Sequence, residues 1–181
     1  KGKLETFRTL NNSEIRKLND IAKKYNIKHQ NKHKLDLVDE ILSNVDVIPN
    51  SIVLAQAAIE SGWGKSRFAK EYNALFGEYT YDDSEGVIPL ERENGDTHLI
   101  KSFSSYSNSV ESYFDNINSH YAYEDFRDIR NIMRKRNNFS NVNLLVNKLS
   151  TYAEDENYIK TIRQVIKTNN FEIFDQKTIS Y

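Results

Sequence analysis

The apolar run from Ile52 to Ile59 constrains the fold of this chain more than any other segment, because an uncharged run of this length has to be buried. A single carboxylate, Glu60, follows it directly. The run IVLAQAAI carries no charge and is long enough for about two helical turns, which predicts a buried helix. A carboxyl group at the end of such a helix loses contact with water. This raises its pKa and suits it to donate a proton near neutral pH. The alternative is a partly exposed surface glutamate in the last turn before a glycine.

A tight turn with the sequence Ser-Gly-Trp-Gly follows Glu60 directly. Gly62 and Gly64 permit backbone angles that other residues avoid, so the chain can bend sharply on both sides of Trp63. Such a turn can hold a large flat ring close to the carboxylate, as carbohydrate sites commonly require. Trp63 is either part of such a site or an anchor of the hydrophobic core.

Hydrophobic periodicity predicts helices on both sides of this region. The first helix has Ser13 as its expected cap, and the central helix begins at Pro49 with Asn50 or Ser51 as its cap. Besides the central helix, helices are expected at residues 12–25, 34–44, 65–72, 109–120, 123–135, 141–150 and 157–168.

The pattern changes between residues 78 and 103. The segment EYTYDDSEG is rich in turn formers, ERENGD contains the dipeptide Asn94-Gly95, and THLIKSF alternates apolar and polar residues. These features indicate a small β-hairpin region. The chain is therefore predicted to be α+β, mainly helical, with a small β-hairpin lobe.

The composition is that of one folded domain. The 181 residues can bury a sizeable core, and 25 basic residues nearly balance 26 acidic ones. Nothing in this balance argues for a nucleic-acid partner, which generally needs a basic face. The chain has no cysteine, which excludes disulfides and thiolate chemistry. No apolar run reaches about 18 residues and no signal peptide begins at Lys1, so this segment is not expected to span a membrane.

The histidines do not indicate a metal site. His29 and His33 stand four residues apart, but the surrounding sequence NIKHQNKHK is rich in lysine and polar, which indicates a solvated segment. His98 and His120 belong to no cluster of metal-ligating residues in the sequence. We therefore expect no bound metal.

The segment AQAAIESGWGKSRFAKEYNALFG resembles the glucosaminidase domains of bacterial cell-wall hydrolases, glycoside hydrolase family 73. The hallmark of that family is a helix-ending Glu-Ser-Gly-Trp-Gly followed by Asn-x-Leu-Phe-Gly, and both parts are present. The segments VIPLERENGDTHLIKSFSSYSNSVESYFDNINSHYAYEDFRDIR and LSTYAEDENYIKTIRQVIK are similar to the Bax-like branch of the family. The similarity runs from about Asp46 to Phe171.

This resemblance implies a lysozyme-like fold and one glucosaminidase domain over residues 1–181, with residues 1–45 as an N-terminal helical extension and 171–181 as a peripheral tail. It implies an endo-β-N-acetylglucosaminidase that cleaves the GlcNAc-β-1,4-MurNAc bond of peptidoglycan without a cofactor. The expected partner is the peptidoglycan glycan strand. The expected location is the periplasm or cell envelope, reached by export, and the expected state is a monomer.

Glu60 is the expected general acid, and a glycosidase of this kind normally needs a second group. The candidates in the β-lobe are Glu78, Asp82, Asp83, Glu85, Glu91 and Glu93, a set too crowded for the sequence alone to resolve. Glu91 is placed relative to the Asn94-Gly95 turn where many members of the family carry a second glutamate, but Pro89 stands where a threonine is common. Glu91 is therefore either the base or a solvated hairpin residue. Without a second carboxylate, the N-acetyl group of the substrate could serve as nucleophile.

Tyr152 is the third catalytic candidate. The segment TYAEDENY resembles the motif Tyr-Ala-Thr-Asp-Pro-x-Tyr, whose first tyrosine is thought to assist catalysis, with Glu154 and Glu156 in place of threonine and proline. Tyr152 and Tyr158 keep the register. Their phenols either bind the acetamido group or the attacking water, or pack at the start of a helix.

Sugar binding is expected from side chains that stack on pyranose rings or bind hydroxyl and acetamido groups. The candidates are Trp63, Asn73, Phe76, Tyr79 and Tyr121. Phe76 could instead belong only to the core, and His120 could border the groove beside Tyr121. Three alternatives stay open for the function: a muramidase, a lytic transglycosylase, or a catalytically silent glycan-binding module.

Overall fold

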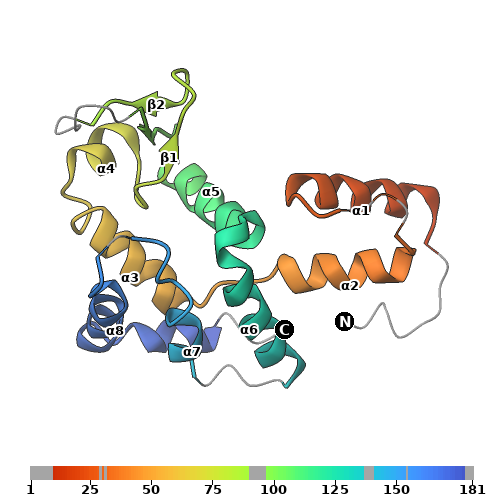
Figure 1. Cartoon of the computed structure of the whole chain (residues 1–181). Coiled ribbons are helices and arrows are strands. Elements are labelled where there is room, and N and C mark those ends of the chain that lie inside the picture. Colours follow the sequence, from red (N-terminus) through yellow and green to blue (C-terminus); the bar gives the residue numbers. More distant parts are fainter. Residues whose placement is uncertain are drawn as a thin grey trace.

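The computed structural model describes residues 10–28, 30, 32–89, 97–136, 141–153 and 155–177, with side chains to residue 175. The molecule is mainly helical with a small three-stranded antiparallel sheet, which confirms the expected fold class. Figure 1 shows two N-terminal helices projecting to one side of a larger helical body, with the sheet at the top of that body.

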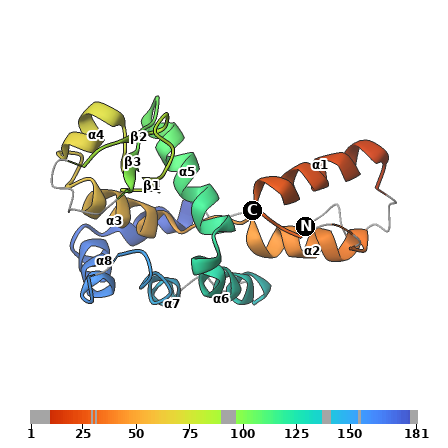
Figure 2. The same cartoon turned by 45° about the horizontal axis from the view of Figure 1, so that its top comes forward.

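The N-terminal helices α1 (Asn12–Lys24) and α2 (Lys34–Asn44) pack against each other as a pair (Figure 2). The bounds of α2 are those predicted. Asn11, rather than Ser13, caps α1, because Asn11 and Glu14 form a reciprocal capping box. The pair has its own small core: Ala22, Ile27, Leu37 and Ile41.

The central helix α3 (Asn50–Glu60) begins after Pro49, as expected, but neither Asn50 nor Ser51 caps it by its side chain. Instead, the carboxylate of Asp175 accepts a hydrogen bond of 2.8 Å from the backbone N–H of Ser51. Asp175 lies in the 3-10 helix η2 (Phe171–Lys177), which packs against α3. The carboxylate that binds the start of α3 is thus 124 residues away in sequence.

A turn with three consecutive left-handed residues follows α3. The φ angles of Gly62, Trp63 and Gly64 are 56°, 59° and 71°. The N–H of Trp63 donates to the carbonyl of Ala58 over 2.7 Å, which fixes this turn to the end of α3. The helix α4 (Arg67–Tyr72) then begins two residues later than predicted.

The sheet contains β1 (Tyr79–Thr80), β2 (Gly86–Val87) and β3 (Leu99–Lys101) in the order β1-β3-β2. Both pairings are antiparallel, and Ile100 on β3 aligns with Tyr79 on one side and Val87 on the other. The Asn94-Gly95 turn expected in this lobe lies outside the described residues.

The C-terminal half adds α5 (Tyr106–Ser119), the 3-10 helix η1 (Tyr121–Tyr123), α6 (Glu124–Lys135), α7 (Asn143–Val146) and α8 (Tyr158–Thr168). The predicted helix at 141–150 is shortened to α7, followed by turns. The main core joins α3 to α5, α6, α7 and α8 through buried side chains that include Ile52, Tyr113, Ile117, Phe126, Leu145 and Ile162. Each such side chain contributes about 1.5–3 kcal/mol when fully buried.

Two arginines on α6 fix the segment that leads into α3. Arg130 is fully buried and donates to the carbonyls of Asn44 and Asp46 over 2.6 and 3.0 Å, and burial lowers its pKa to about 10. Arg134 makes two hydrogen bonds of 2.6 and 2.8 Å to the carboxylate of Asp46. These contacts attach the chain before α3 to the helical body. Among the described residues, no helix is long and apolar enough to cross a membrane.

Candidate active site

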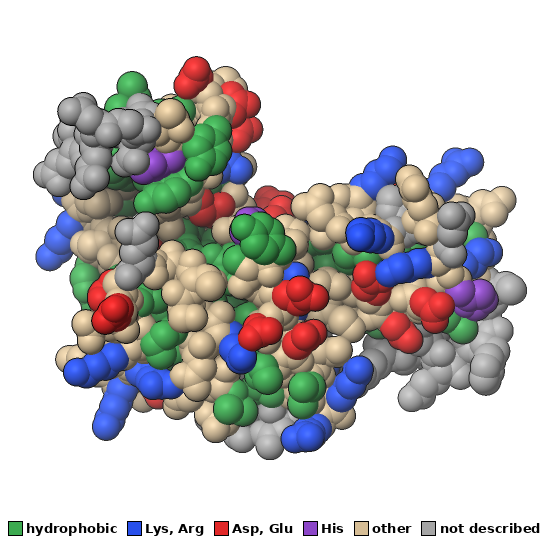
Figure 3. All heavy atoms as spheres, viewed as in Figure 1, with side chains coloured by type: hydrophobic (Ala, Val, Ile, Leu, Met, Phe, Trp, Pro, Cys, Tyr) green, Lys and Arg blue, Asp and Glu red, His purple; other side chains and the backbone are tan. Residues whose placement is uncertain are grey.

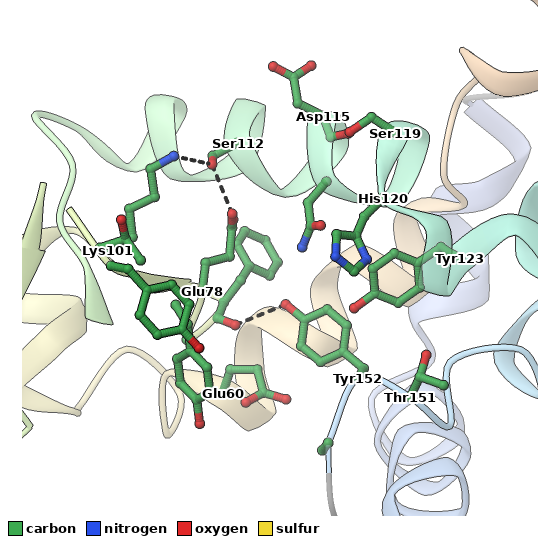
Figure 4. Close-up of a pocket in the computed structure, with 17 residues that line it drawn as sticks. Glu60, Glu78, Lys101, Ser112, Asp115, Ser119, His120, Tyr123, Thr151 and Tyr152 are labelled. Carbon is green, nitrogen blue, oxygen red and sulfur yellow. Dashed lines mark hydrogen bonds between the residues drawn. The ribbon is translucent and has the colours of Figure 1, made fainter. Parts of the chain in front are cut away.

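A groove of about 900 Å³ lies between the sheet and the helical body. Figure 3 shows the surface hollowed below the lobe that carries the sheet. The groove is lined by the end of α3, the β-lobe, α5, η1 and the segment before α8, through Glu60, Phe76, Gly77, Glu78, Tyr79, Thr80, Tyr81, Lys101, Ser112, Asp115, Asn116, Ser119, His120, Tyr123, Thr151, Tyr152 and Ala153. In Figure 4, Glu60 and Tyr152 lie together on one side, and Ser112 and Asp115 lie along α5 on the opposite side.

Glu60 is half-buried at the end of α3, where its side chain enters the groove. Its Oε1 accepts a hydrogen bond of 2.7 Å from the hydroxyl of Tyr158 on α8. Burial raises the pKa of Glu60, and the hydrogen bond from Tyr158 opposes part of that rise because it stabilises the ionised form. The environment of Glu60 therefore favours the protonated carboxyl expected of a proton donor.

A chain of buried hydrogen bonds, in which each donor and acceptor is defined, connects the core to Tyr158, the partner of Glu60. Tyr113 donates to Gln56 Oε1 over 2.6 Å, and Gln56 Nε2 donates to the hydroxyl oxygen of Tyr158 over 2.9 Å. Gln56 lies four residues before Glu60, on the same face of α3. Since Tyr158 uses its only proton on Glu60 Oε1, that oxygen is an acceptor. In the protonated acid, the proton is therefore on Oε2.

Gly77 leaves room for this second oxygen. A Cβ atom placed on Gly77 would lie 3.6 Å from Glu60 Oε2, and the φ angle of Gly77 is 63°. Glycine adopts this angle without the strain that a side chain would bring. The Asn-x-Leu-Phe-Gly segment thus passes directly beside the carboxyl group of Glu60.

Tyr152 lies beside Glu60 in the same groove. Its hydroxyl donates to the carbonyl of Phe76 over 2.9 Å, and its ring is parallel to that of Tyr158, with 5.9 Å between centroids. Burial raises the pKa of Tyr152 well above its usual value, so the phenol stays neutral. With its proton given to Phe76, the hydroxyl oxygen of Tyr152 can only accept a further hydrogen bond.

Glu78 enters the groove from the β-lobe. Its Oε2 accepts a hydrogen bond of 2.9 Å from Ser112 on α5, and Lys101 on β3 donates to the same serine oxygen over 3.3 Å (Figure 4). Burial raises the pKa of Glu78, while Ser112 and Lys101 oppose that rise. The sequence did not distinguish Glu78 from the other candidate carboxylates of the β-lobe, because its partners lie 23 and 34 residues further along the chain.

Two of the predicted sugar-binding residues line the groove. The ring of Tyr79 is 63% exposed and stacks on His98 with 4.3 Å between centroids. Phe76 is only 2% exposed, and its ring stacks on Tyr113 at 4.2 Å inside the core. Tyr79 therefore places an exposed ring at the groove, whereas the ring of Phe76 lies in the core and its backbone carbonyl accepts a hydrogen bond from Tyr152.

The other three are not among the described residues that line the groove. Trp63 is 56% exposed on the turn after α3. Asn73 ends α4 in the left-handed conformation and donates its amide to the carbonyl of Phe103 over 2.9 Å. Tyr121 is 80% exposed and lines a second depression of about 260 Å³, which shares Thr151 with the groove.

Glu91, the second catalytic carboxylate considered from the sequence, lies outside the described residues. The exposed residues Asp82, Asp83 and Glu85 do not line the described groove. Within the described chain, no group of three metal-ligating side chains is present. His33 instead caps α2, where its Nδ1 accepts from the N–H of Leu35.

Sequence reasoning did not assign roles to Gln56, Ser112 or Lys101, and it treated Tyr158 only as the partner of Tyr152 in a motif. The spacing of Gln56 and Glu60 was visible, since residues four apart share a helix face. Local sequence has no comparable signal for Ser112 and Lys101, because their contacts depend on how α5 packs against the sheet.

The chain matches the family model for glucosaminidase, described as mannosyl-glycoprotein endo-beta-N-acetylglucosaminidase, over residues 35–171. Protein bax of Escherichia coli K12 is 35% identical over 141 residues, which cover 78% of this chain and 50% of bax. The peptidoglycan hydrolase FlgJ of Escherichia coli K12 is 34% identical over 92 residues, which cover 45% of this chain and 29% of FlgJ. This chain thus spans half the length of bax and less than a third of FlgJ.

Among solved structures, the catalytic domain of the autolysin Auto from Listeria monocytogenes matches 96% of this chain and 94% of its own length, with a TM-score of 0.53 and 17% sequence identity. At that identity the likeness concerns the fold. The family match covers most of the chain and includes Glu60, Gly77 and Tyr152. The chain therefore belongs to the glucosaminidase family.

Proposed function

We propose that this protein is a peptidoglycan hydrolase, an endo-β-N-acetylglucosaminidase that cleaves the GlcNAc-β-1,4-MurNAc bond with Glu60 as general acid. The observation that carries the proposal is the placement of Glu60, a half-buried carboxyl group with a raised pKa that enters a large groove. The likeness to FlgJ, a peptidoglycan hydrolase, supports the substrate class.

In the proposed reaction, Glu60 gives its Oε2 proton to the glycosidic oxygen as the bond between that oxygen and the anomeric carbon breaks. The transfer avoids a free alkoxide leaving group, and general acid catalysis of this kind contributes about 10²–10⁴-fold to the rate. The hydrogen bond from Tyr158 to Oε1 holds the carboxyl group in place. When the proton leaves, the same bond stabilises the carboxylate.

The groove has features that suit an amino-sugar polymer. Its volume of about 900 Å³ is within the range of ligand sites, and the exposed ring of Tyr79 offers a face for a sugar. The hydroxyl oxygen of Tyr152 can accept the N–H of an acetamido group, because its own proton binds Phe76. We further propose that the protein acts after export, in the periplasm or cell envelope, since its substrate lies there.

The test is an end-group analysis. Purified peptidoglycan is digested with the protein, the fragments are reduced with borohydride, and mass spectrometry identifies the reduced sugar. We expect reduced GlcNAc ends. Reduced MurNAc ends would instead indicate a muramidase, and anhydro-MurNAc ends a lytic transglycosylase. Peptidoglycan that is bound but never cut would indicate a glycan-binding module.

A further inference from the structure

We propose that Glu78 is the second catalytic carboxylate of this groove, the base that takes a proton from the attacking water. The inference rests on the proposed function, because it assigns a second role in the same hydrolysis. Glu78 and Glu60 enter the groove from different parts of the molecule, Glu78 from the start of the sheet and Glu60 from the end of α3. They are also held by different helices, through Ser112 on α5 and Tyr158 on α8.

The direction of the hydrogen bonds distinguishes the two carboxyl groups. The ammonium group of Lys101 can only donate, so Ser112 accepts from Lys101 and directs its own proton to Glu78 Oε2. Burial raises the pKa of both carboxyl groups, but only Glu78 is linked to a cation through a hydroxyl, and Ser112 and Lys101 oppose the rise of its pKa. Glu60 receives its hydrogen bond from a neutral phenol instead. Two carboxyl groups in such different surroundings are suited to opposite roles, one as acid and one as base.

The second oxygen of Glu78 lacks a hydrogen-bond partner among the described residues. This oxygen, Oε1, is buried. Leaving such an atom unpaired costs free energy, and a turn of the carboxyl group toward the groove that Glu78 lines would let a water molecule or a substrate group donate to it. A water molecule that donates to Oε1 would be oriented and activated by the carboxylate.

The titratable groups that act on Glu78 come from four elements. They are Lys101 on β3, Asp115 and Tyr113 on α5, Tyr123 on η1, and Tyr152 before α8. Lys101 favours the ionised form of Glu78, whereas the charge of Asp115 opposes it. The three phenols have raised pKa values and stay neutral in the working range.

The proposed step balances as a direct displacement. The water oxygen forms a bond to the anomeric carbon while one of its protons moves to Glu78 Oε1. The bond from the anomeric carbon to the glycosidic oxygen breaks, and that oxygen takes the proton of Glu60 Oε2. Glu78 ends protonated and Glu60 ionised, and exchange of one proton with solvent restores both. Two carboxyl groups that act in this way form the inverting arrangement of glycosidases.

The test compares Glu78→Gln, Glu78→Ala and Glu91→Gln with the wild type on peptidoglycan, and circular dichroism checks that each variant folds. The control is Glu111→Gln, which removes the same charge beside Ser112 but concerns an exposed carboxylate that faces Lys24. We expect both Glu78 variants to lose about 10²–10⁴-fold in kcat and Glu111→Gln to keep wild-type activity. Wild-type kcat in Glu78→Gln, or the same loss in Glu91→Gln alone, would overturn the assignment.

Rescue by added azide distinguishes a catalytic base at Glu78 from a residue with only a structural role. Because azide is already an anion, it attacks without a base, so it should restore turnover in Glu78→Ala and give a glycosyl azide. No rescue in a folded Glu78→Ala would contradict the role.

In Lys101→Met, the acidic limb of the profile of kcat/KM against pH should move to higher pH, since the pKa of Glu78 rises without the cation. A wild type that never cuts peptidoglycan would refute the proposed function, whereas an active wild type with active Glu78 variants would refute this inference alone.

Discussion

Tyr158 donates a hydrogen bond of 2.7 Å to Oε1 of Glu60, although 98 residues separate the two in sequence. The same hydroxyl oxygen accepts from Gln56, so the orientation of its proton is fixed. This relationship assigns the two oxygens of Glu60 different tasks. Oε1 is anchored to the body of the protein, and Oε2 is the oxygen that can carry a proton into the groove.

Replacing Tyr158 with phenylalanine should shift the pH profile of the reaction. The hydrogen bond lowers the pKa of Glu60, so its loss lets that pKa rise further and Glu60 stays protonated to higher pH. The basic limb of the profile of kcat/KM against pH should therefore move upward. The variant should also lose about 1–3 kcal/mol of unfolding free energy, because Gln56 Nε2 loses its acceptor.

The control for this variant is Tyr106→Phe, which removes the same hydroxyl from an exposed tyrosine at the start of α5. It should leave both the pH profile and the unfolding free energy unchanged. A basic limb that stays in place or moves downward in Tyr158→Phe would contradict the assigned hydrogen bond.

Gly77→Ala should impair the reaction more than its effect on folding explains. The new methyl group would lie 3.6 Å from Glu60 Oε2, at a backbone angle that costs about 1–2 kcal/mol for a residue with a side chain. Gly64→Ala is a matched control, because its φ angle is 71° and, among the described residues, no atom lies within 4 Å of the added group. Chemical denaturation and turnover on peptidoglycan should reveal similar destabilisation of both variants but lost activity in Gly77→Ala only. Equal activity in the two would argue that Oε2 does not face the substrate.

Tyr152→Phe tests the acceptor proposed for the acetamido group. The variant loses the hydrogen bond to Phe76 and the oxygen that would receive the substrate N–H. The loss of one such bond, about 1–1.5 kcal/mol, should raise the Kd of a chitooligosaccharide about tenfold. A chitosan oligomer of equal length, which has no acetamido groups, serves as the comparison in a binding assay. Its affinity should not change, and an equal loss for both oligomers would exclude this role.

Asp175→Ala should destabilise the whole protein, although Asp175 lies close to the end of the chain. It removes the carboxylate that accepts from Ser51 at the start of α3, and the loss of a helix cap costs about 0.5–2 kcal/mol. Glu172→Ala changes an exposed carboxylate in the same 3-10 helix and should cost little. Thermal unfolding of the two variants measures the difference, and equal melting temperatures would mean that Asp175 does not support the central helix.

Local patterns were enough to predict the main helices and the position of Glu60. The run before Glu60 has no charge, so its burial follows from its composition, and the bounds of α2 agree with its periodicity. The sequence also indicated a small sheet between residues 78 and 103. These features depend on residues that are neighbours in the chain.

Long-range contacts account for what the sequence could not predict. Asp175, rather than a local side chain, binds the start of α3, and the partners of Glu78 come from a strand and a helix further along the chain. Asn73 has the residue type of a sugar ligand, but its amide is bound to the carbonyl of Phe103. Residue type and spacing therefore indicate which residues could belong to the site. The packing of distant elements determines which of them face the groove.

The most direct test of the central claim is the turnover of Glu60→Gln on purified peptidoglycan, with binding to insoluble peptidoglycan measured in parallel. Glutamine keeps the shape and can still accept the hydrogen bond of Tyr158, but it has no acidic proton to donate. We expect binding close to that of the wild type and a fall in kcat of about 10²–10⁴-fold. Wild-type turnover by Glu60→Gln would contradict the account and remove Glu60 from the reaction.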